Sequence, residues 1–182
     1  TPGVAQADFS PVISHYDNNV QLLSSKTTTI RTHNRTSGSG TKNVLLIGDS
    51  LTDLQTLPTA VKTLLDADTD VTFNQIGTRG DITGKHEGRS SWRWEDYIQG
   101  SDYAGKSNAF WIGGELDFSA YISDNGFAGL DYVLINLGTN DVNQGLEFIS
   151  DSELDTIISN AKTFVDAIVA DFPSCKIGIV LP

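Results

Sequence analysis

The hydrophobic pattern of the chain alternates between short apolar runs and longer segments in which apolar residues recur at helical spacing. The runs have the length of strands that are buried on both faces of a sheet. Because strands and helices alternate, the pattern predicts an α/β fold with a parallel sheet and right-handed crossovers. The predicted strands cover residues 44–47, 71–76, 132–137 and 177–181.

The apolar positions also predict two long helices. The first begins near Pro58, a residue that suits the first turn of a helix. The second begins at Ser150, which forms a capping-box pattern with Glu153, and its apolar face continues to about Asp171. We expect loops at residues 77–94, a helical start at residues 94–97, and a long excursion over the face of the site at residues 99–129.

The N-terminal part of the chain has a different composition. Residues 1–41 are polar, although residues 20–23 and 27–32 contain the residue types that favour strands. The Ser-Gly-Ser-Gly segment at residues 37–40 indicates a flexible joint. We therefore expect residues 1–41 to form an extension, or the tail of a preceding β module, and residues 42–182 to form the main domain.

Composition narrows the classes of protein that fit. The chain has 182 residues, enough for one domain with a substantial core. It carries 23 acidic against 12 basic residues, which argues against nucleic acid or an anionic membrane surface as a partner. The single cysteine, Cys175, excludes an internal disulfide framework. No glycine-rich phosphate loop follows a predicted strand, so a nucleotide-binding domain is the weakest hypothesis.

The turn after the first predicted strand carries the strongest chemical signal. Gly48 lets the backbone turn sharply, and the residues after it are good helix caps. This pattern places Ser50 at the carboxyl end of a parallel strand, where ligands bind in open α/β sheets. It also places Ser50 at a helix start, which favours a developing alkoxide. Ser50 is therefore a candidate nucleophile, and the alternative is that it only caps the helix.

Two short motifs behind buried strands strengthen the first interpretation. Gly-Asp-Ser-Leu at residues 48–51 resembles the first block of the SGNH (GDSL) hydrolases, and Gly-Thr-Asn-Asp at residues 138–141 resembles their third block. The resemblance covers roughly residues 42–182. It implies a flavodoxin-like α/β/α sandwich and ester hydrolysis through Ser50. It also implies that Asn140 donates a hydrogen bond to the oxyanion, together with backbone N–H groups.

The second block of this family has two possible positions. Gly80 and Asp81 resemble its usual Gly-Asp. The segment from Gly88 to Ser91, followed by Trp92, resembles the Gly-x-x-Gly-aromatic version of carbohydrate-esterase branches, with Ser91 replacing the second glycine. A backbone donor survives that replacement if the required φ is negative. We favour Gly88 and Ser91, with Gly80 as the alternative and a loop without a catalytic role as the third possibility.

The resemblance implies a catalytic base that these motifs do not supply. The family places it in an Asp-x-x-His block near the C-terminus, and none of His15, His33 and His86 lies in such a motif. We therefore expect the main domain to be incomplete at its C-terminal end and inactive alone. The uncharged strand at residues 177–181 should then be covered by the rest of the same polypeptide or by a second chain.

The sequence thus predicts a serine esterase that acts on small acyl esters, such as acetyl groups on carbohydrate. The alternative is a non-catalytic glycan-binding or structural module with a hydrolase-like fold. We expect no cofactor, and the adjacent His86 and Glu87 are too few for a metal site. Most aromatic residues of the loops are expected to be structural. Substrate contacts are expected from Asp49, His86, Arg89, Trp92 and Trp111.

Overall fold

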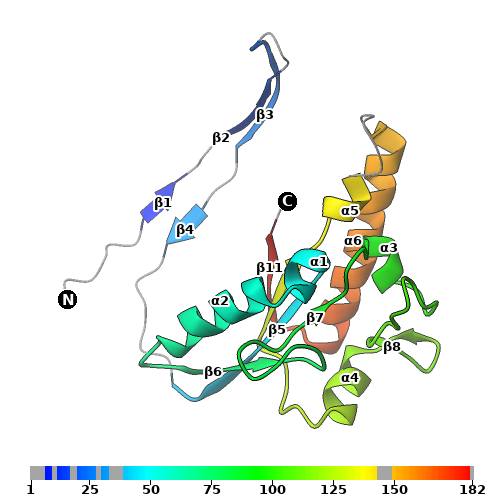
Figure 1. Ribbon diagram of the computed structural model, residues 1–182. Coiled ribbons are helices and arrows are strands. Elements are labelled where there is room, and N and C mark those ends of the chain that lie inside the picture. Colours follow the sequence, from blue (N-terminus) through cyan, green and yellow to red (C-terminus); the bar gives the residue numbers. More distant parts are fainter. Residues whose placement is uncertain are drawn as a thin grey trace. The chain divides into compact units, whose positions relative to one another are not determined.

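The computed structural model describes residues 7–9, 12–16, 20–27, 30–32, 39–142 and 149–180. The chain divides into two compact units, Thr1–Gly38 and Ser39–Pro182, which we describe separately (Figure 1). The expected joint at residues 37–40 lies partly outside the described residues.

The first unit consists of antiparallel strand pairs. Strand β1 (Ala7–Phe9) pairs with β4 (Ile30–Thr32), and β2 (Val12–Tyr16) pairs with β3 (Leu22–Thr27). The strand-favouring composition of this region is consistent with these pairs. His15 lies in β2, while His33 falls outside the described residues.

A parallel sheet forms the centre of the second unit, which confirms the predicted α/β fold. Its strand order is β11-β10-β5-β6, and the two-residue strand β7 pairs with the end of β5. The first predicted strand is longer than its apolar run because the polar residues 41–43 also pair with β6. The strands are β5 (Thr41–Gly48), β6 (Thr72–Ile76), β7 (Glu87–Gly88), β10 (Tyr132–Asn136) and β11 (Lys176–Val180).

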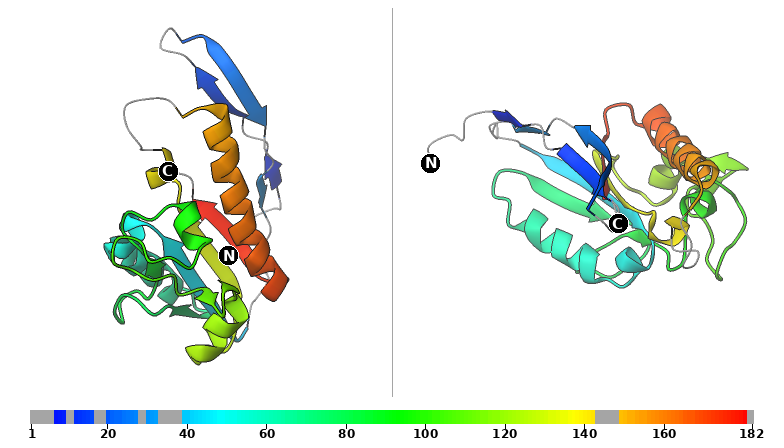
Figure 2. Two further views of the ribbon diagram at one scale, coloured as in Figure 1. Left: turned by 90° about the vertical axis from the view of Figure 1, so that its right-hand side faces the viewer. Right: turned by 90° about the horizontal axis from the view of Figure 1, so that it is seen from above.

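The two long helices lie on opposite faces of this sheet, α2 (Thr56–Asp66) on one and α6 (Asp151–Asp171) on the other (Figure 2). The predicted capping box is present, since Ser150 and Glu153 exchange their hydrogen bonds at the start of α6. Short helices follow several strands and loops: α1 (Ser50–Asp53), α3 (Trp94–Tyr97), α4 (Phe118–Asp124) and α5 (Thr139–Val142). No helix among the described residues is both long and apolar enough to cross a membrane.

Residues 99–129 do more than cross the face of the site. They contain α4 and the hairpin of β8 (Trp111–Ile112) and β9 (Glu115–Leu116), and they contribute to the core beside α6. Phe110 stacks on Phe118 with ring centroids 4.6 Å apart, and both pack against Phe164 of α6. Most loop aromatics are therefore structural, but in the main core rather than in a satellite cluster.

Strand β11 lies at one edge of the sheet. Two of its apolar side chains remain exposed, Ile179 at 49% and Val180 at 46%. The strand has no charged residue after Lys176 among its described residues, so nothing on it discourages pairing with another strand. That a partner covers this edge stays a prediction.

Candidate active site

Three neighbouring strands end side by side at the carboxyl edge of the sheet. Gly48, at the end of β5, is in register with Gly88 of β7 on one side and with Asn136 of β10 on the other. The chain continues from these ends to Ser50, Ser91 and Asn140. The topology therefore gathers the predicted nucleophile and two predicted donors from separate parts of the sequence at the edge where α/β proteins bind ligands.

Close packing fixes the turn that carries Ser50. A Cβ added at Gly48 would lie 2.1 Å from Thr52 Oγ1 and 2.8 Å from the carbonyl oxygen of Asn136, so only glycine fits there. Asp49 caps α1, since its Oδ1 accepts a hydrogen bond from Leu51 N at 2.9 Å. Ser50 is the first residue of α1 and is half-buried. Its side chain can therefore meet a substrate, and its backbone N–H lies at the helix start.

Asp49 does not occupy the role expected from the sequence. Its side chain is fully buried, so the structure places it beneath the turn rather than in contact with a substrate. Burial raises the pKa of Asp49, although the hydrogen bond that Leu51 donates acts in the opposite direction. The function of Asp49 visible in the structure is to cap α1 and hold Ser50 in place.

Asn140 lies in α5 and is half-buried. Its Nδ2 donates a hydrogen bond to the carbonyl oxygen of Trp92 at 3.0 Å. This bond uses one of the two amide hydrogens and fixes the plane of the amide. The other hydrogen remains for an acceptor in the site, which is what an oxyanion donor requires.

The segment after β7 presents a turn with unusual backbone geometry. Trp92 N donates to the carbonyl oxygen of Arg89 at 3.1 Å, and Ser91 within this turn has a φ of 71°. The condition of a negative φ at Ser91 is therefore not met. A positive φ favours glycine, so Ser91 adopts a backbone conformation that is uncommon for a residue with a side chain. Its N–H makes no hydrogen bond within the described residues, which leaves it available as a donor.

Gly88 and Gly80 have structural contacts instead. The N–H of Gly88 donates to His86 Nδ1 at 2.9 Å, and a Cβ at Gly88 would lie 2.5 Å from Asp53 N in α1. Gly88 thus lets α1 approach β7 closely, and its own N–H is already used. Gly80 has a φ of 74° and packs against Gly84, Gln55 and His86 within the loop after β6.

Two residues expected to contact substrate are buried. His86 is 1% exposed, its Nδ1 accepts the hydrogen bond from Gly88, and burial lowers its pKa, so it is a neutral structural residue. Arg89 is 4% exposed and forms an ion pair with Glu87, its Nη1 lying 2.9 Å from Glu87 Oε2. His86 and Arg89 were expected to contact a substrate, whereas the structure satisfies their polar groups internally.

Glu87 is the centre of this internal network, a role that no local sequence pattern indicates. The side chain is fully buried, and its Oε1 accepts hydrogen bonds from the hydroxyl of Thr78 at 2.6 Å and that of Tyr121 at 2.8 Å. Tyr121 lies in α4, so the network links the loop after β6 to the core. Only the tertiary fold reveals partners so distant in sequence.

The aromatic candidates also differ from expectation. Trp92 is fully buried, its Nε1 donates to the carbonyl oxygen of Tyr103 at 3.0 Å, and the guanidinium of Arg89 lies over its ring at 5.0 Å from the centroid. Its ring therefore cannot form a wall of the site, although its carbonyl orients Asn140. Trp111 is half-buried and packs so closely on Gly100 that a Cβ there would lie 2.1 Å from Trp111 Nε1.

Asp53 is a site residue that the sequence analysis missed. It lies one helical turn after Ser50 on α1 and accepts hydrogen bonds from Ser90 Oγ at 2.6 Å and from Arg79 at 2.7 Å. Burial opposes its ionisation, but the bonds from Ser90 and Arg79 outweigh that effect and lower the pKa to about 2. Asp53 therefore stays charged and ties the turn at Ser90 to α1. Its spacing of one helical turn from Ser50 is the sequence feature that could have identified it.

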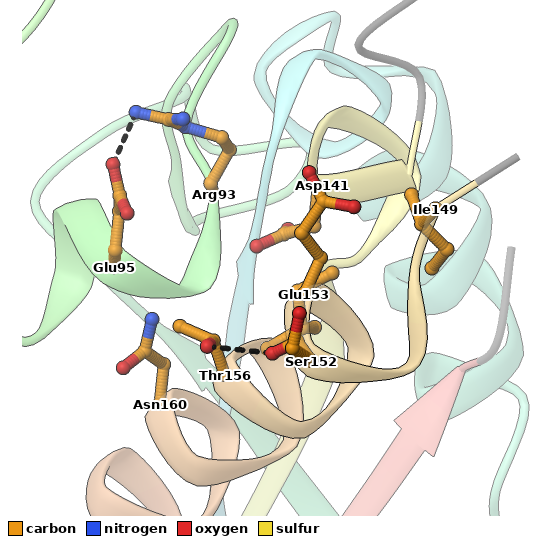
Figure 3. Close-up of a pocket in the computed structure, with 9 residues that line it drawn as sticks. Arg93, Glu95, Asp141, Ile149, Ser152, Glu153, Thr156 and Asn160 are labelled. Carbon is orange, nitrogen blue, oxygen red and sulfur yellow. Dashed lines mark hydrogen bonds and ion pairs between the residues drawn. The ribbon is translucent and has the colours of Figure 1, made fainter. Parts of the chain in front are cut away.

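A cavity of about 290 Å³ lies between α3, α5 and the start of α6 (Figure 3). Asp141, the neighbour of Asn140, lies in its wall. The residues that line the cavity are Arg93, Glu95, Asp141, Ile149, Ser152, Glu153, Thr156, Ile157 and Asn160. Within the part of the chain that the structure describes, no three His, Cys, Asp or Glu side chains gather in a way that could hold a metal ion.

No base for Ser50 is found within residues 39–142 and 149–180. His86 is the one histidine within these residues, and its buried ring accepts a hydrogen bond from Gly88 N. No side chain there accepts a hydrogen bond from the Ser50 hydroxyl. The described site thus consists of the candidate nucleophile Ser50 and the candidate donors Ser91 and Asn140.

Comparison with known proteins gives matches among solved structures alone. No protein-family model matches the chain, and no curated protein matches it. A carbohydrate esterase family 2 enzyme with a carbohydrate-binding domain, from Corynascus thermopiles (Myceliophthora fergusii), matches 87% of this chain and 49% of its own at 18% identity and a TM-score of 0.48.

Two further solved structures match at similar levels. One is an active-site mutant of a family two carbohydrate esterase from Clostridium thermocellum in complex with celluohexase, at 14% identity and a TM-score of 0.46, covering 92% of this chain and 51% of that one. The other is a carbohydrate esterase whose active site is described as displaying divergent catalytic and non-catalytic binding functions, at 16% identity and a TM-score of 0.46, covering 76% of this chain and 48% of that one. The chain spans about half the length of the structures that it matches.

Proposed function

We propose that this chain carries the nucleophile and the oxyanion donors of an SGNH-type serine esterase that hydrolyses small acyl esters, such as acetyl groups on carbohydrate. The observation that carries this proposal is the alignment of Gly48, Gly88 and Asn136 across three strands, which brings Ser50, Ser91 and Asn140 to one edge of the sheet. The alternative that Ser50 only caps its helix is less well supported, because Asp49 is the N-cap of α1 and Ser50 is the first residue of the helix.

Each of these residues has a step in acyl transfer. Ser50 Oγ attacks the ester carbonyl carbon and loses its proton to a base, and the carbonyl oxygen becomes an oxyanion. The N–H groups of Ser50 and Ser91 and the Nδ2 of Asn140 donate to that oxyanion. The intermediate then expels the alcohol, which takes up the proton, and water hydrolyses the acyl-enzyme. Losing one such donor typically costs about 3–4 kcal/mol of transition-state stabilisation.

The base is proposed to come from outside the described residues. The open edge at β11 offers a place for the element that brings it, because a strand added there would end at the same edge of the sheet as Asn136. Further polypeptide of the same protein or a second chain would fulfil this role. The 182 residues alone should then hydrolyse esters no faster than a Ser50→Ala variant does.

The glycan-binding alternative is less well supported. The two aromatic residues expected to contact a sugar do not present free rings, since Trp92 is fully buried and Trp111 packs against Gly100. Esterase activity is therefore the function that this geometry favours.

The deciding experiment uses the native polypeptide that contains this segment. We expect a fluorophosphonate probe to modify Ser50, as mapped by mass spectrometry, and Ser50→Ala to abolish both labelling and hydrolysis of an acetyl ester. Asn140→Ala should lower kcat roughly a hundredfold or more with little change in KM. Asn125→Ala is a matched control, because Asn125 also donates its amide to a backbone carbonyl, that of Tyr121 at 2.8 Å, but at the end of α4. Labelling that persists in Ser50→Ala would overturn the proposal.

A further inference from the structure

We propose that Asp141 is a positioning residue for the oxyanion site, because its carboxylate and the Asn140 amide together clamp the backbone of residues 92–94 against α5. This inference rests on the proposed function for its catalytic consequence, while the clamp itself can be tested without catalysis.

The clamp consists of two hydrogen bonds of opposite polarity. The amide of Asn140 donates to the carbonyl oxygen of Trp92 at 3.0 Å, and the carboxylate of Asp141 accepts from Trp94 N at 3.2 and 3.4 Å. Adjacent residues on α5 thus hold backbone groups two residues apart on the other segment. Asn140 and Asp141 could not exchange places, because a carboxylate cannot donate a hydrogen bond to the carbonyl of Trp92.

Asp141 also satisfies a helix end. Trp94 is the first residue of α3, so its N–H has no acceptor within that helix. The side chain of Asp141 supplies the acceptor from a distant part of the chain, in the way that a capping residue does locally. The start of α3 and the turn of Asn140 are therefore fixed to each other.

The segment held by the clamp is the more rigid partner. The side chains of Trp92 and Trp94 are 0% and 4% exposed and belong to the main core. Helix α5, in contrast, has four residues and follows Gly138, which has a φ of 121°. A helix of one turn has little stability of its own. Loss of the Asp141 bond should therefore move α5, and with it Asn140, rather than the tryptophan segment.

The charge of Asp141 depends on two neighbouring groups, Arg93 at the N-cap of α3 and Asp96 within that helix. Glu95 of α3 and Glu153 of α6 line the same cavity (Figure 3). Burial raises the pKa of Asp141 to about 6, and Asp96 adds to the shift, while the bond from Trp94 and the charge of Arg93 oppose it. The carboxylate is therefore ionised, and its acceptor strength greatest, above about pH 6.

The first test follows the clamp itself by nuclear magnetic resonance of the isotope-labelled 182-residue protein. We expect the backbone amide of Trp94 and the side-chain amide of Asn140 to titrate together with a midpoint near pH 6, and this titration to vanish in Asp141→Asn. Asp131→Asn is the control, since Asp131 also accepts a backbone N–H, that of Asn43 at 2.9 Å, at the opposite end of the strands. Titration of Trp94 or Asn140 that survives in Asp141→Asn would refute the clamp.

The second test uses the esterase activity of the native polypeptide. Asp141→Ala should lower kcat roughly tenfold to a hundredfold at constant KM, because the donor is misplaced rather than removed. Asp141→Asn keeps an acceptor oxygen and should recover most of this loss, while the activity change near pH 6 disappears. A rise in KM with unchanged kcat, or equal losses in the two variants, would refute the positioning role. A wild-type protein without esterase activity would instead refute the proposed function, and the resonance test would still decide on the clamp.

Discussion

The buried ion pair of Glu87 and Arg89 gives the sharpest prediction about stability. Both side chains are almost completely enclosed, with exposed fractions of 0% and 4%. Arg89 also donates from Nε to the carbonyl oxygen of Ser107 at 2.7 Å, so its position is fixed from two sides. A charged group at such a site cannot be solvated by water if its partner is lost.

The substitution Glu87→Gln tests this dependence with little change in volume. It keeps an oxygen for Thr78 and Tyr121 but removes the charge that faces Arg89. Removing one partner of a buried pair typically costs about 3–5 kcal/mol. Natural domains have free energies of unfolding of about 5–15 kcal/mol, so the variant should lose a large part of its stability.

The measurement is guanidinium denaturation followed by tryptophan fluorescence, because Trp92 and Trp94 are buried in the native state. Asp66→Asn is the matched control: Lys62 and Asp66 are 2.6 Å apart, but on the surface of α2, and breaking such a pair costs about 1 kcal/mol or less. The double variant Glu87→Gln, Arg89→Met should recover part of the lost stability. A loss in Glu87→Gln no larger than that in Asp66→Asn would refute the argument from burial.

Three further predictions follow from other contacts. Gly88→Ala should lower the free energy of unfolding by about 1–3 kcal/mol and reduce labelling of Ser50, because the new Cβ meets Asp53 N at 2.5 Å; an unchanged melting temperature would contradict this. Asp53, with its pKa lowered to about 2, stabilises the fold above its unfolded pKa of about 3.9, and this contribution is lost as the pH falls toward 2. Asp53→Asn should therefore lower the free energy of unfolding by about 2 kcal/mol at pH 7, and the variant should lose less stability than the wild type as the pH falls. Equal losses of stability at acid pH in the variant and the wild type would argue against this role. The exposed edge at β11 should make the 182-residue chain self-associate in sedimentation experiments, and Ile179→Lys should reduce this; a monomeric wild type would contradict it.

Much of the fold could be predicted because its signals are local. The apolar runs and the capping box at Ser150 mark elements whose residues are neighbours in sequence. Strand β7 could not be predicted in this way, because Glu87 and Gly88 are unusual in a strand and pair with β5 only through the tertiary fold. The excursion at residues 99–129 was underestimated for a similar reason, since its aromatics are spaced irregularly and meet only around α6.

The same distinction between local and tertiary signals applies to the candidate site. The positions of Ser50 and Asn140 follow from strand ends, which the sequence marks clearly. The burial of His86 and Arg89 does not, because polar side chains in a glycine-rich loop are usually solvated. Arg89 lies over the ring of Tyr97, and its partner Glu87 accepts a hydrogen bond from Tyr121. These tyrosines lie in other elements and carry no pattern that points to a loop partner.

The same network reaches the turn that carries Ser50. The hydroxyl of Tyr97 lies 2.8 Å from the carbonyl oxygen of Gly48 and 2.5 Å from that of Glu87, and the N–H of Arg89 also donates to Gly48 at 2.8 Å. Burial raises the pKa of Tyr97 to well above its usual value, so the hydroxyl keeps its proton and can donate. Gly48 directly precedes the turn of Ser50, and its carbonyl is held by groups whose positions depend on the Glu87–Arg89 ion pair. A polar network inside the core therefore sets the geometry of the strand end on which the proposed chemistry depends.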